Sequence, residues 1–163
     1  MDFAIGTSGS DFGRMKLRLL VVGKMVPELA SYEARFRKRL TTDWTLEVVE
    51  LPEGRSKQLA QRKQEEEKHI LKMVQGSFVL FDERGKTLSS TAWSAMLQQL
   101  PGNACQDFVI GGAAGVSDVV RQQAARTWSL SMLTLPHQMA RVMVVEQLYR
   151  AWSIAKGHPY HRE

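Results

Sequence analysis

The strongest constraint on the fold lies in residues 107–136, where a short apolar run leads directly into a cluster of glycines. The apolar run covers residues 108–110, and a helical pattern begins after Ser117. This order predicts a strand, a glycine turn and a helix. Because glycine has no Cβ, backbone N–H groups in such a turn can approach a ligand closely. The turn is therefore a candidate ligand cradle, built by Gly111, Gly112 and Gly115.

A second apolar segment follows the helix over residues 130–135 and ends at Pro136. Its leucines predict a fifth strand near residues 130–133. Ser131 and Thr134 place hydroxyl groups among these apolar residues. We expect the glycine turn and this segment to face one pocket.

Length and composition favour one globular domain. The chain has 163 residues, of which 44% are apolar and 24% are charged. These values argue against a disordered or fibrous protein. Lysine and arginine outnumber aspartate and glutamate by 22 to 17, so the formal net charge is +5. This excess favours an anionic partner such as nucleic acid, and the alternative is a mildly basic soluble surface.

The single cysteine, Cys105, cannot form an internal disulfide, which suits a reducing compartment. No run reaches the roughly 18–20 apolar residues of a membrane span, and nothing reads as a signal peptide. We therefore expect a cytoplasmic protein with no membrane association. Residues 1–14 are rich in Gly, Ser and Asp and precede a second methionine, Met15. We interpret them as a disordered extension, from a tag or an upstream start, and residues 15–163 as a single domain.

Strand and helix patterns alternate along the chain. Apolar and β-branched runs predict strands at residues 16–22, 44–51, 78–81, 108–110 and 130–133. Amphipathic or charged patterns predict helices at residues 29–40, 56–74 and 116–126, a helix capped by Ser89 or Ser90, and a long last helix from about Gln138. Residues 82–86 are expected to form a loop. The alternation predicts an α/β fold with a mostly parallel sheet and helices on both faces.

Spacing rules out several familiar motifs. The RGKT run at residues 84–87 resembles the end of a phosphate-binding P-loop, but Leu80 stands where that pattern requires glycine. The glycines also miss the spacing of dinucleotide-binding turns. His158 and His161 have no Cys or carboxylate at metal-ligand spacing, so we predict no metal. The chain has no serine elbow and no plausible Cys–His pair for acyl transfer.

Polar and cationic residues concentrate toward the C-terminus, after the glycine turn. Glu146 and Arg150 are four residues apart, so their alternative is an ion pair on the surface of the last helix. For the tail itself, the alternative is a frayed surface end. The residues concerned are His137, Arg141, Glu146, Arg150, His158, Tyr160, His161 and Arg162.

Three segments resemble the SPOUT class of methyltransferases. They are the glycine turn at residues 111–115, the run SLSMLTLPHQMARVMVVEQLYRAW at residues 129–152, and the ending HPYHRE. The resemblance covers residues 15–163 and makes Met15 the expected native start. The resemblance is most specific at the C-terminal end. There the sequence resembles those members of the class that methylate N3 of a pseudouridine in 23S ribosomal RNA.

The resemblance implies an α/β fold whose C-terminal part is tied in a trefoil knot. It implies S-adenosylmethionine as methyl donor, bound in that knot, and a homodimer whose substrate is 23S rRNA in the assembled ribosome. The donor site carried over by the resemblance comprises Phe81, Gly111, Gly112, Gly115, Ser131, Met132, Leu133, Thr134, Leu135 and Pro136.

Roles for the remaining polar residues follow from the chemistry that the resemblance implies. The N3 imide is a weak acid, so a base or a neighbouring cation assists the transfer. We expect Glu146 or His137 to accept the N3 proton, and Arg150 to stabilise the developing negative charge. RNA binding is assigned to Arg141, His158, Tyr160, His161 and Arg162. The alternatives are a ribosome-binding factor without enzymatic activity and a SPOUT methyltransferase that acts on tRNA.

Overall fold

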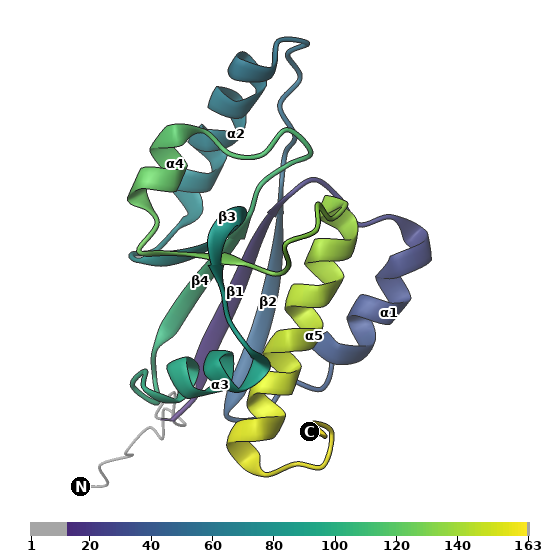
Figure 1. Ribbon diagram of the computed structural model, residues 1–163, viewed down its shortest axis with the longest axis vertical. Coiled ribbons are helices and arrows are strands. Elements are labelled where there is room, and N and C mark those ends of the chain that lie inside the picture. Colours follow the sequence, from purple (N-terminus) through teal and green to yellow (C-terminus); the bar gives the residue numbers. More distant parts are fainter. Residues whose placement is uncertain (1–12, 163) are drawn as a thin grey trace, which may run out of the picture.

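The computed structural model describes residues 13–162, so most of the expected N-terminal extension at residues 1–14 lies outside the described residues. Five strands and five helices are present in this part of the chain (Figure 1). In chain order they are β1 (Met15–Val22), α1 (Pro27–Arg37), β2 (Trp44–Leu51), α2 (Leu59–Met73), β3 (Phe78–Thr87), α3 (Ser90–Gln98), β4 (Cys105–Ile110), α4 (Asp118–Gln123), β5 (Arg126–Ser129) and α5 (His137–Lys156).

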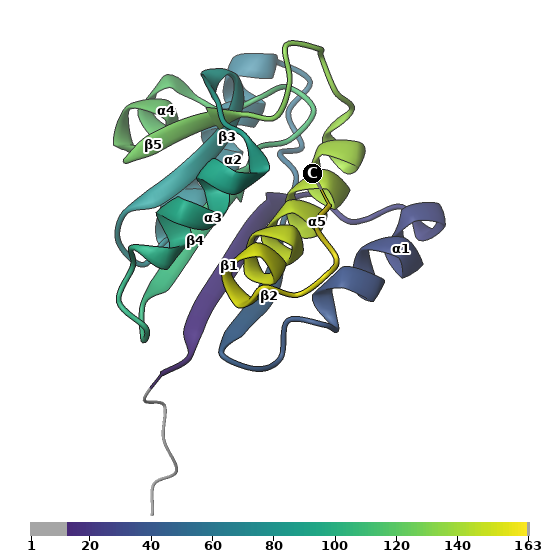
Figure 2. The ribbon, with the colours of Figure 1, turned by 60° about the horizontal axis from the view of Figure 1, so that its bottom comes forward.

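The strands form one sheet in the order β2-β1-β4-β3-β5, and every neighbouring pair is parallel. A parallel sheet buries both of its faces under helices. Here α1, α3 and α5 lie on one face, and α2 and α4 on the other (Figure 2). The α/β fold with a parallel sheet, predicted from the alternation of strands and helices, is confirmed.

Each face of the sheet has its own hydrophobic core. Alternate side chains of β1 enter the two cores, because successive residues of a strand point to opposite faces. Leu17 and Leu19 pack with Phe36, Trp93 and Leu148 beneath α1, α3 and α5. The second core lies beneath α2 and α4 and contains Leu20, Val22, Ile70 and Val120. The all-round apolar character of residues 16–22 thus follows from burial on both sides.

Two of the helices, α3 and α4, begin at serine caps. Ser89 caps α3 by accepting a hydrogen bond from the Ala92 N–H at 3.1 Å, which decides between the two serines predicted for this role. Ser117 caps α4 in the same way, accepting from the Val120 N–H at 3.3 Å. Each cap satisfies a backbone donor that the first helical turn leaves unpaired.

The predicted fifth strand at residues 130–133 is wrong. β5 precedes it, at Arg126–Ser129, and pairs with β3. Leu130 and Leu135 instead line a pocket, while Met132 and Leu133 are exposed. An apolar run that faces a ligand cavity has the same pattern as a buried strand, which explains the error.

Two other boundaries differ from the prediction. α4 ends at Gln123, not near residue 126, because Arg126 already belongs to β5. Residues 82–86, predicted as a loop, fall within β3. Phe81 and Lys86 both pair with Trp128, so the residues between them bulge out of the ladder. This bulge carries charged side chains to the carboxyl end of the sheet.

No helix within residues 13–162 is long and apolar enough to cross a membrane. The trefoil knot remains a prediction carried by the resemblance to SPOUT proteins.

Candidate functional site

A cavity of about 460 Å³ opens at the carboxyl ends of β3 and β4. This is where open parallel sheets usually bind ligands, and the volume suits a small organic molecule. Three segments supply the walls: the end of β3 with its bulge, the glycine turn after β4, and the loop between β5 and α5. Their residues in the wall are Phe81, Asp82, Glu83, Arg84, Ile110, Gly111, Gly112, Ala113, Ala114, Gly115, Val116, Ser129, Leu130, Ser131, Leu133, Thr134, Leu135 and Pro136, joined by Lys63, Arg121, His137 and Ala140.

The glycine turn is closed by a hydrogen bond from the Gly115 N–H to the Gly112 carbonyl, at 2.9 Å. Gly115 has φ +82°, a conformation that side-chain-bearing residues rarely adopt. A Cβ on Gly111 would stand 2.5 Å from Cγ1 of Val116. The tight return of the chain therefore requires glycine at both ends of the turn, for two different reasons.

Gly112 is constrained from the side of the protein interior. A Cβ there would lie 3.0 Å from Oε2 of Glu66 and 3.1 Å from Cγ1 of Val22, neither of which lines the cavity. The sequence suggested that Gly112 leaves room for a ligand. The structure adds a second constraint, because the turn rests closely on a carboxyl group beneath it.

That carboxyl group belongs to Glu66 of α2, which is buried. Its Oε1 accepts a hydrogen bond from the Gly54 N–H at 3.0 Å, while Oε2 has no partner within residues 13–162. Burial raises the pKa of Glu66 above its ordinary value. The next residue, Glu67, accepts a hydrogen bond from the hydroxyl of Ser117 at 2.5 Å. Two consecutive glutamates of α2 thus support the glycine turn and the start of α4.

Charged side chains form the rim of the cavity. Arg121 pairs with Asp82 at 3.1 Å and with Asp118 at 2.8 Å, which ties α4 to the β3 bulge. The hydroxyl of Thr134 donates to Glu83 across the opening, at 3.4 Å. No ion pair within the described chain engages Lys63 or Arg84. Both cations remain available to an anionic group of a ligand.

Phe81 lines the cavity and packs against three other aromatic rings. Its ring stacks on Trp93 at 5.3 Å and on Phe108 at 5.9 Å, and Trp128 meets it edge-on at 6.2 Å. Such a cluster fixes the ring orientation. Phe81 therefore gives the cavity a rigid apolar wall.

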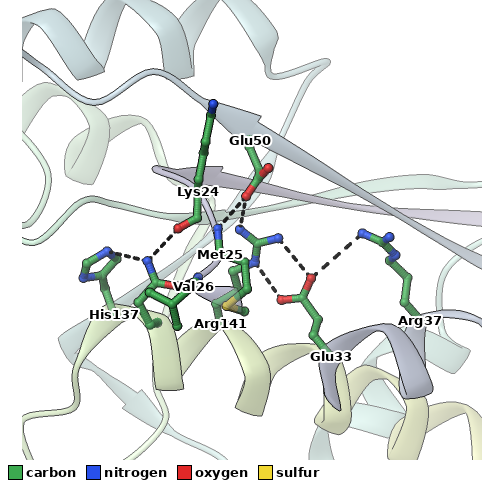
Figure 3. A network of polar contacts seen from close by, with 9 residues as sticks. Lys24, Met25, Val26, Glu33, Arg37, Glu50, His137 and Arg141 are labelled. Carbon is green, nitrogen blue, oxygen red and sulfur yellow. Dashed lines mark hydrogen bonds and ion pairs between the residues drawn. The ribbon is translucent and has the colours of Figure 1, made fainter. Parts of the chain in front are cut away.

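Arg141 occupies the centre of a polar network (Figure 3). The residue is buried, with 4% of its surface exposed. It donates to Glu33 at 2.7 and 3.0 Å and to Glu50 at 2.7 Å. Glu50 also accepts from the Met25 N–H at 2.7 Å. Burial opposes the charged form of Glu50, but the Arg141 guanidinium and the Met25 N–H, with a smaller contribution from Lys24, together outweigh it and lower the pKa of that carboxyl. The network fastens α5 to α1, β2 and the turn after β1.

The far end of α5 carries a second cluster, centred on Glu146. Its Oε1 accepts hydrogen bonds from Arg150 and from the Tyr160 hydroxyl, the latter at 2.9 Å. Burial, and then the Glu146 hydrogen bond, raises the pKa of Tyr160 to about 12. Arg150 also approaches Nδ1 of His161 at 3.2 Å. The tail is therefore anchored to α5 as far as His161, and the predicted alternative of a frayed end does not describe these residues.

Comparison with known proteins decides the family. A family model described as a predicted SPOUT methyltransferase matches residues 15–161. The chain belongs to the SPOUT methyltransferases. Proteins named ribosomal RNA large subunit methyltransferase H are among its relatives. The protein of Hydrogenovibrio crunogenus is 42% identical, over 91% of this chain and 100% of its own length. That of Neisseria meningitidis is 44% identical with the same coverage.

A solved structure supports the fold of this SPOUT methyltransferase. A probable methylase family protein from Haemophilus influenzae superposes with a TM-score of 0.52, covering 91% of this chain and 70% of that one. The two sequences are 13% identical, so the likeness concerns the fold alone.

The cavity of this methyltransferase brings together nearly all residues predicted for the methyl donor. Met132 is the exception, since it does not line the cavity and is 98% exposed. His137, predicted as a catalytic residue, also lies in the wall. Glu146 and Arg150 do not, because they follow His137 by roughly 13 and 20 Å along α5 at about 1.5 Å per residue.

The residues predicted to bind RNA lie outside the cavity wall. Arg141 is buried and fully engaged by Glu33 and Glu50, so the geometry favours a positioning role over the predicted RNA contact. His158, Tyr160 and His161 gather with Arg150 near the far end of α5, and Arg162 follows them as an exposed residue.

Sequence reasoning missed the charged rim. Lys63, Asp82, Glu83 and Arg84 come from segments predicted as a solvated helix and a loop. One signal was present, because residues 82–84 directly follow the apolar core of a predicted parallel strand, where ligand-binding residues gather. For Lys63 the only signal was its place among the basic residues at the start of the predicted helix, which fits a solvated face as well as an anion contact.

Proposed function

We propose that this protein transfers a methyl group from S-adenosylmethionine to N3 of a pseudouridine in 23S rRNA of the assembled ribosome. The observation that carries the proposal is full-length similarity, at 42–44% identity, to proteins named ribosomal RNA large subunit methyltransferase H. The cavity at the glycine turn supports it, because the donor residues expected from the family resemblance gather there.

The cavity suits the chemical parts of the donor. The apolar side chains of Phe81, Leu130 and Leu135 offer a surface for a flat base. Backbone groups of the glycine turn supply donors and acceptors close to the ligand. Lys63 or Arg84 can hold a carboxylate, and Glu83 an ammonium group.

The donor supplies an electrophilic methyl group, which the acceptor nitrogen displaces from sulfur in line. The protein has to align the two reactants and take up the N3 proton. His137 is the better-placed candidate for that proton, because it lies in the cavity wall. Glu146 of the same chain lies roughly 13 Å further along α5. Its predicted role, and that of Arg150 toward developing charge, therefore requires a second subunit.

A homodimer is part of the proposal. Four exposed apolar side chains mark the pocket end of the molecule: Met132, Leu133, Met139 and Met143. Met139 and Met143 are four residues apart, so they share one face of α5. Exposed apolar clusters of this kind typically mark contact surfaces. Light scattering at micromolar concentration should show a dimer, and an active monomer would contradict this part of the proposal.

Methyl transfer to ribosomes tests the activity directly. The purified protein is incubated with radiolabelled S-adenosylmethionine and ribosomes from a strain that lacks this methyltransferase. We expect label in 23S rRNA, and mass mapping should place it on N3 of one pseudouridine. Label in tRNA would show that tRNA is the substrate and would contradict the proposed rRNA substrate. Ribosome binding without donor binding would leave a ribosome-binding factor that has no methyltransferase activity.

A further inference from the structure

An exposed stripe along α1 and the turn that follows it carries Tyr32, Arg35 and Arg39. Tyr32 and Arg35 are three positions apart and share one face of α1, and Arg39 lies two residues beyond the end of the helix at Arg37. Tyr32 is 46% exposed, although tyrosine rings are usually covered. The guanidinium carbon of Arg35 lies 5.3 Å from the centre of the Tyr32 ring. The stripe thus presents an aromatic ring and cations to solvent.

The stripe is continuous with the tail cluster. The guanidinium carbon of Arg39 lies 5.5 Å from the ring centre of Tyr149, on α5. The Tyr149 ring contacts that of Tyr160 at 4.7 Å, and Arg150 lies over Tyr160 at 4.9 Å. Figure 2 shows the C-terminal segment beside α1 and α5. The guanidinium groups of Arg39, in the turn after α1, and of Arg150, on α5, therefore rest on neighbouring aromatic rings, which fixes their orientation.

The acidic groups of this region do not neutralise Arg35 and Arg39. Glu33, on the inner side of α1, is buried and engaged by Arg141. Glu146 is held by Arg150 and Tyr160. Within residues 13–162, Arg35 and Arg39 form no ion pair. A guanidinium that is oriented but unpaired is suited to an anion from outside the molecule.

We propose that Tyr32, Arg35 and Arg39 form a docking surface for the phosphate backbone of the RNA substrate. This inference rests on the proposed function. Guanidinium groups match phosphate oxygens in a two-pronged geometry. The Tyr32 ring meets Phe36 edge-on at 5.2 Å, and its exposed part can stack on an unpaired base. The sequence assigned RNA binding to Tyr160, whose ring packs on Phe36 and Tyr149 and whose hydroxyl is bonded to Glu146.

The test compares two double variants with the same charge change. Arg35→Gln with Arg39→Gln removes two cations from the stripe. Lys57→Gln with Lys68→Gln removes two exposed lysines from the other side of the sheet and serves as the control. Binding to ribosomes from a strain lacking this methyltransferase is measured against salt concentration. Each lost phosphate contact lowers the slope of log affinity against log salt by about 0.7–0.9, so the arginine variant should lose roughly 1.4–1.8 and the control nothing.

Activity separates docking from catalysis. In the arginine variant, KM for ribosomes should rise while kcat and S-adenosylmethionine affinity stay at the wild-type level. Arg35→Lys with Arg39→Lys keeps the charge and should restore most of the salt slope. An unchanged slope and KM in the glutamine variant would overturn the proposal. Loss of the dimer in that variant would also overturn it, by showing that the stripe contacts a second copy of the chain.

Failure of the proposed function has a different signature. Wild-type protein that binds ribosomes without transferring methyl groups would contradict the activity, and the salt slope would still decide the docking surface. Wild-type protein that binds no ribosomes would contradict both.

Discussion

The two ends of α5 differ in how their charged side chains are used. At the pocket end, Lys63 and Arg84 line the cavity without an ion pair in the described chain, and loops form most of the wall. At the tail end, Glu146 accepts hydrogen bonds from both Arg150 and Tyr160. The pocket thus leaves charges available to a ligand, whereas the tail spends several of them on holding itself in place. Polar side chains that are close together near the C-terminus can therefore hold the tail in place instead of binding a ligand.

Arg141 lies between these two ends, and its removal should have the largest effect on stability. Arg141→Ala leaves Glu33 buried without its partner, so we expect a loss of about 3–5 kcal/mol in the free energy of unfolding. Urea denaturation measures it. Arg37→Ala is the control, because the Arg37 side chain is 41% exposed and its contact with Glu33 is long, at 3.9 Å, so it should contribute less than about 1 kcal/mol. Equal losses in the two variants would show that burial does not set the difference.

Deleting residues 158–163 tests whether the tail acts on RNA. We expect methylation of ribosomes to fall roughly 100-fold, or about 2.7 kcal/mol at 1.36 kcal/mol per tenfold. S-adenosylmethionine affinity should stay nearly unchanged, because none of residues 158–162 lines the cavity. Calorimetry and ribosome assays give the two values. Circular dichroism at the assay temperature checks folding, since the deletion also removes the packing of Tyr160 on Phe36 and Tyr149. Full methylation by the truncated protein would remove the tail from function.

Gly112→Val tests the support beneath the glycine turn. The new Cβ meets Glu66 and Val22 within about 3 Å, so overpacking should cost roughly 1–3 kcal/mol of stability. The turn must shift to relieve it, and donor affinity should fall at least about tenfold. Gly102→Val is the matched control, because nothing lies within 4 Å of a Cβ at Gly102. Donor affinity at the wild-type level in Gly112→Val would exclude the turn from the donor site.

Glu66→Gln should have the smallest effect, and one that depends on pH. Burial raises the pKa of Glu66 in the folded protein above 4.5, the ordinary value that applies to the unfolded chain. At pH values between the two, the Glu66 carboxyl is protonated in the folded protein and ionised in the unfolded chain. Wild-type stability therefore declines as pH rises through that window. The glutamine variant lacks this decline, so its advantage over wild type should grow from acid to neutral pH. Denaturation midpoints of both proteins, measured across pH, test this. A constant difference between the two midpoints at all pH values would contradict the prediction.

The general architecture could be predicted from the sequence because it depends on local patterns. All-round apolar runs such as residues 16–22 predict strands buried on both faces, and β1 has this character. The serine caps and the glycine turn are local too, since each satisfies or bends the backbone within a few residues. The same logic failed at residues 130–133, where leucines face a cavity and imitate a strand.

Only the tertiary structure decided which polar residues act together. The sequence places Glu66 in a run of three glutamates, with nothing to distinguish it from a solvated neighbour. Packing of α2 beneath Gly112 buries that carboxyl and leaves its neighbours partly exposed. Arg141 and Glu33 are 108 positions apart and meet because α1 and α5 share one face of the sheet. Burial and long-range pairing depend on how elements are assembled in space, and periodicity along the chain carries no information about that assembly.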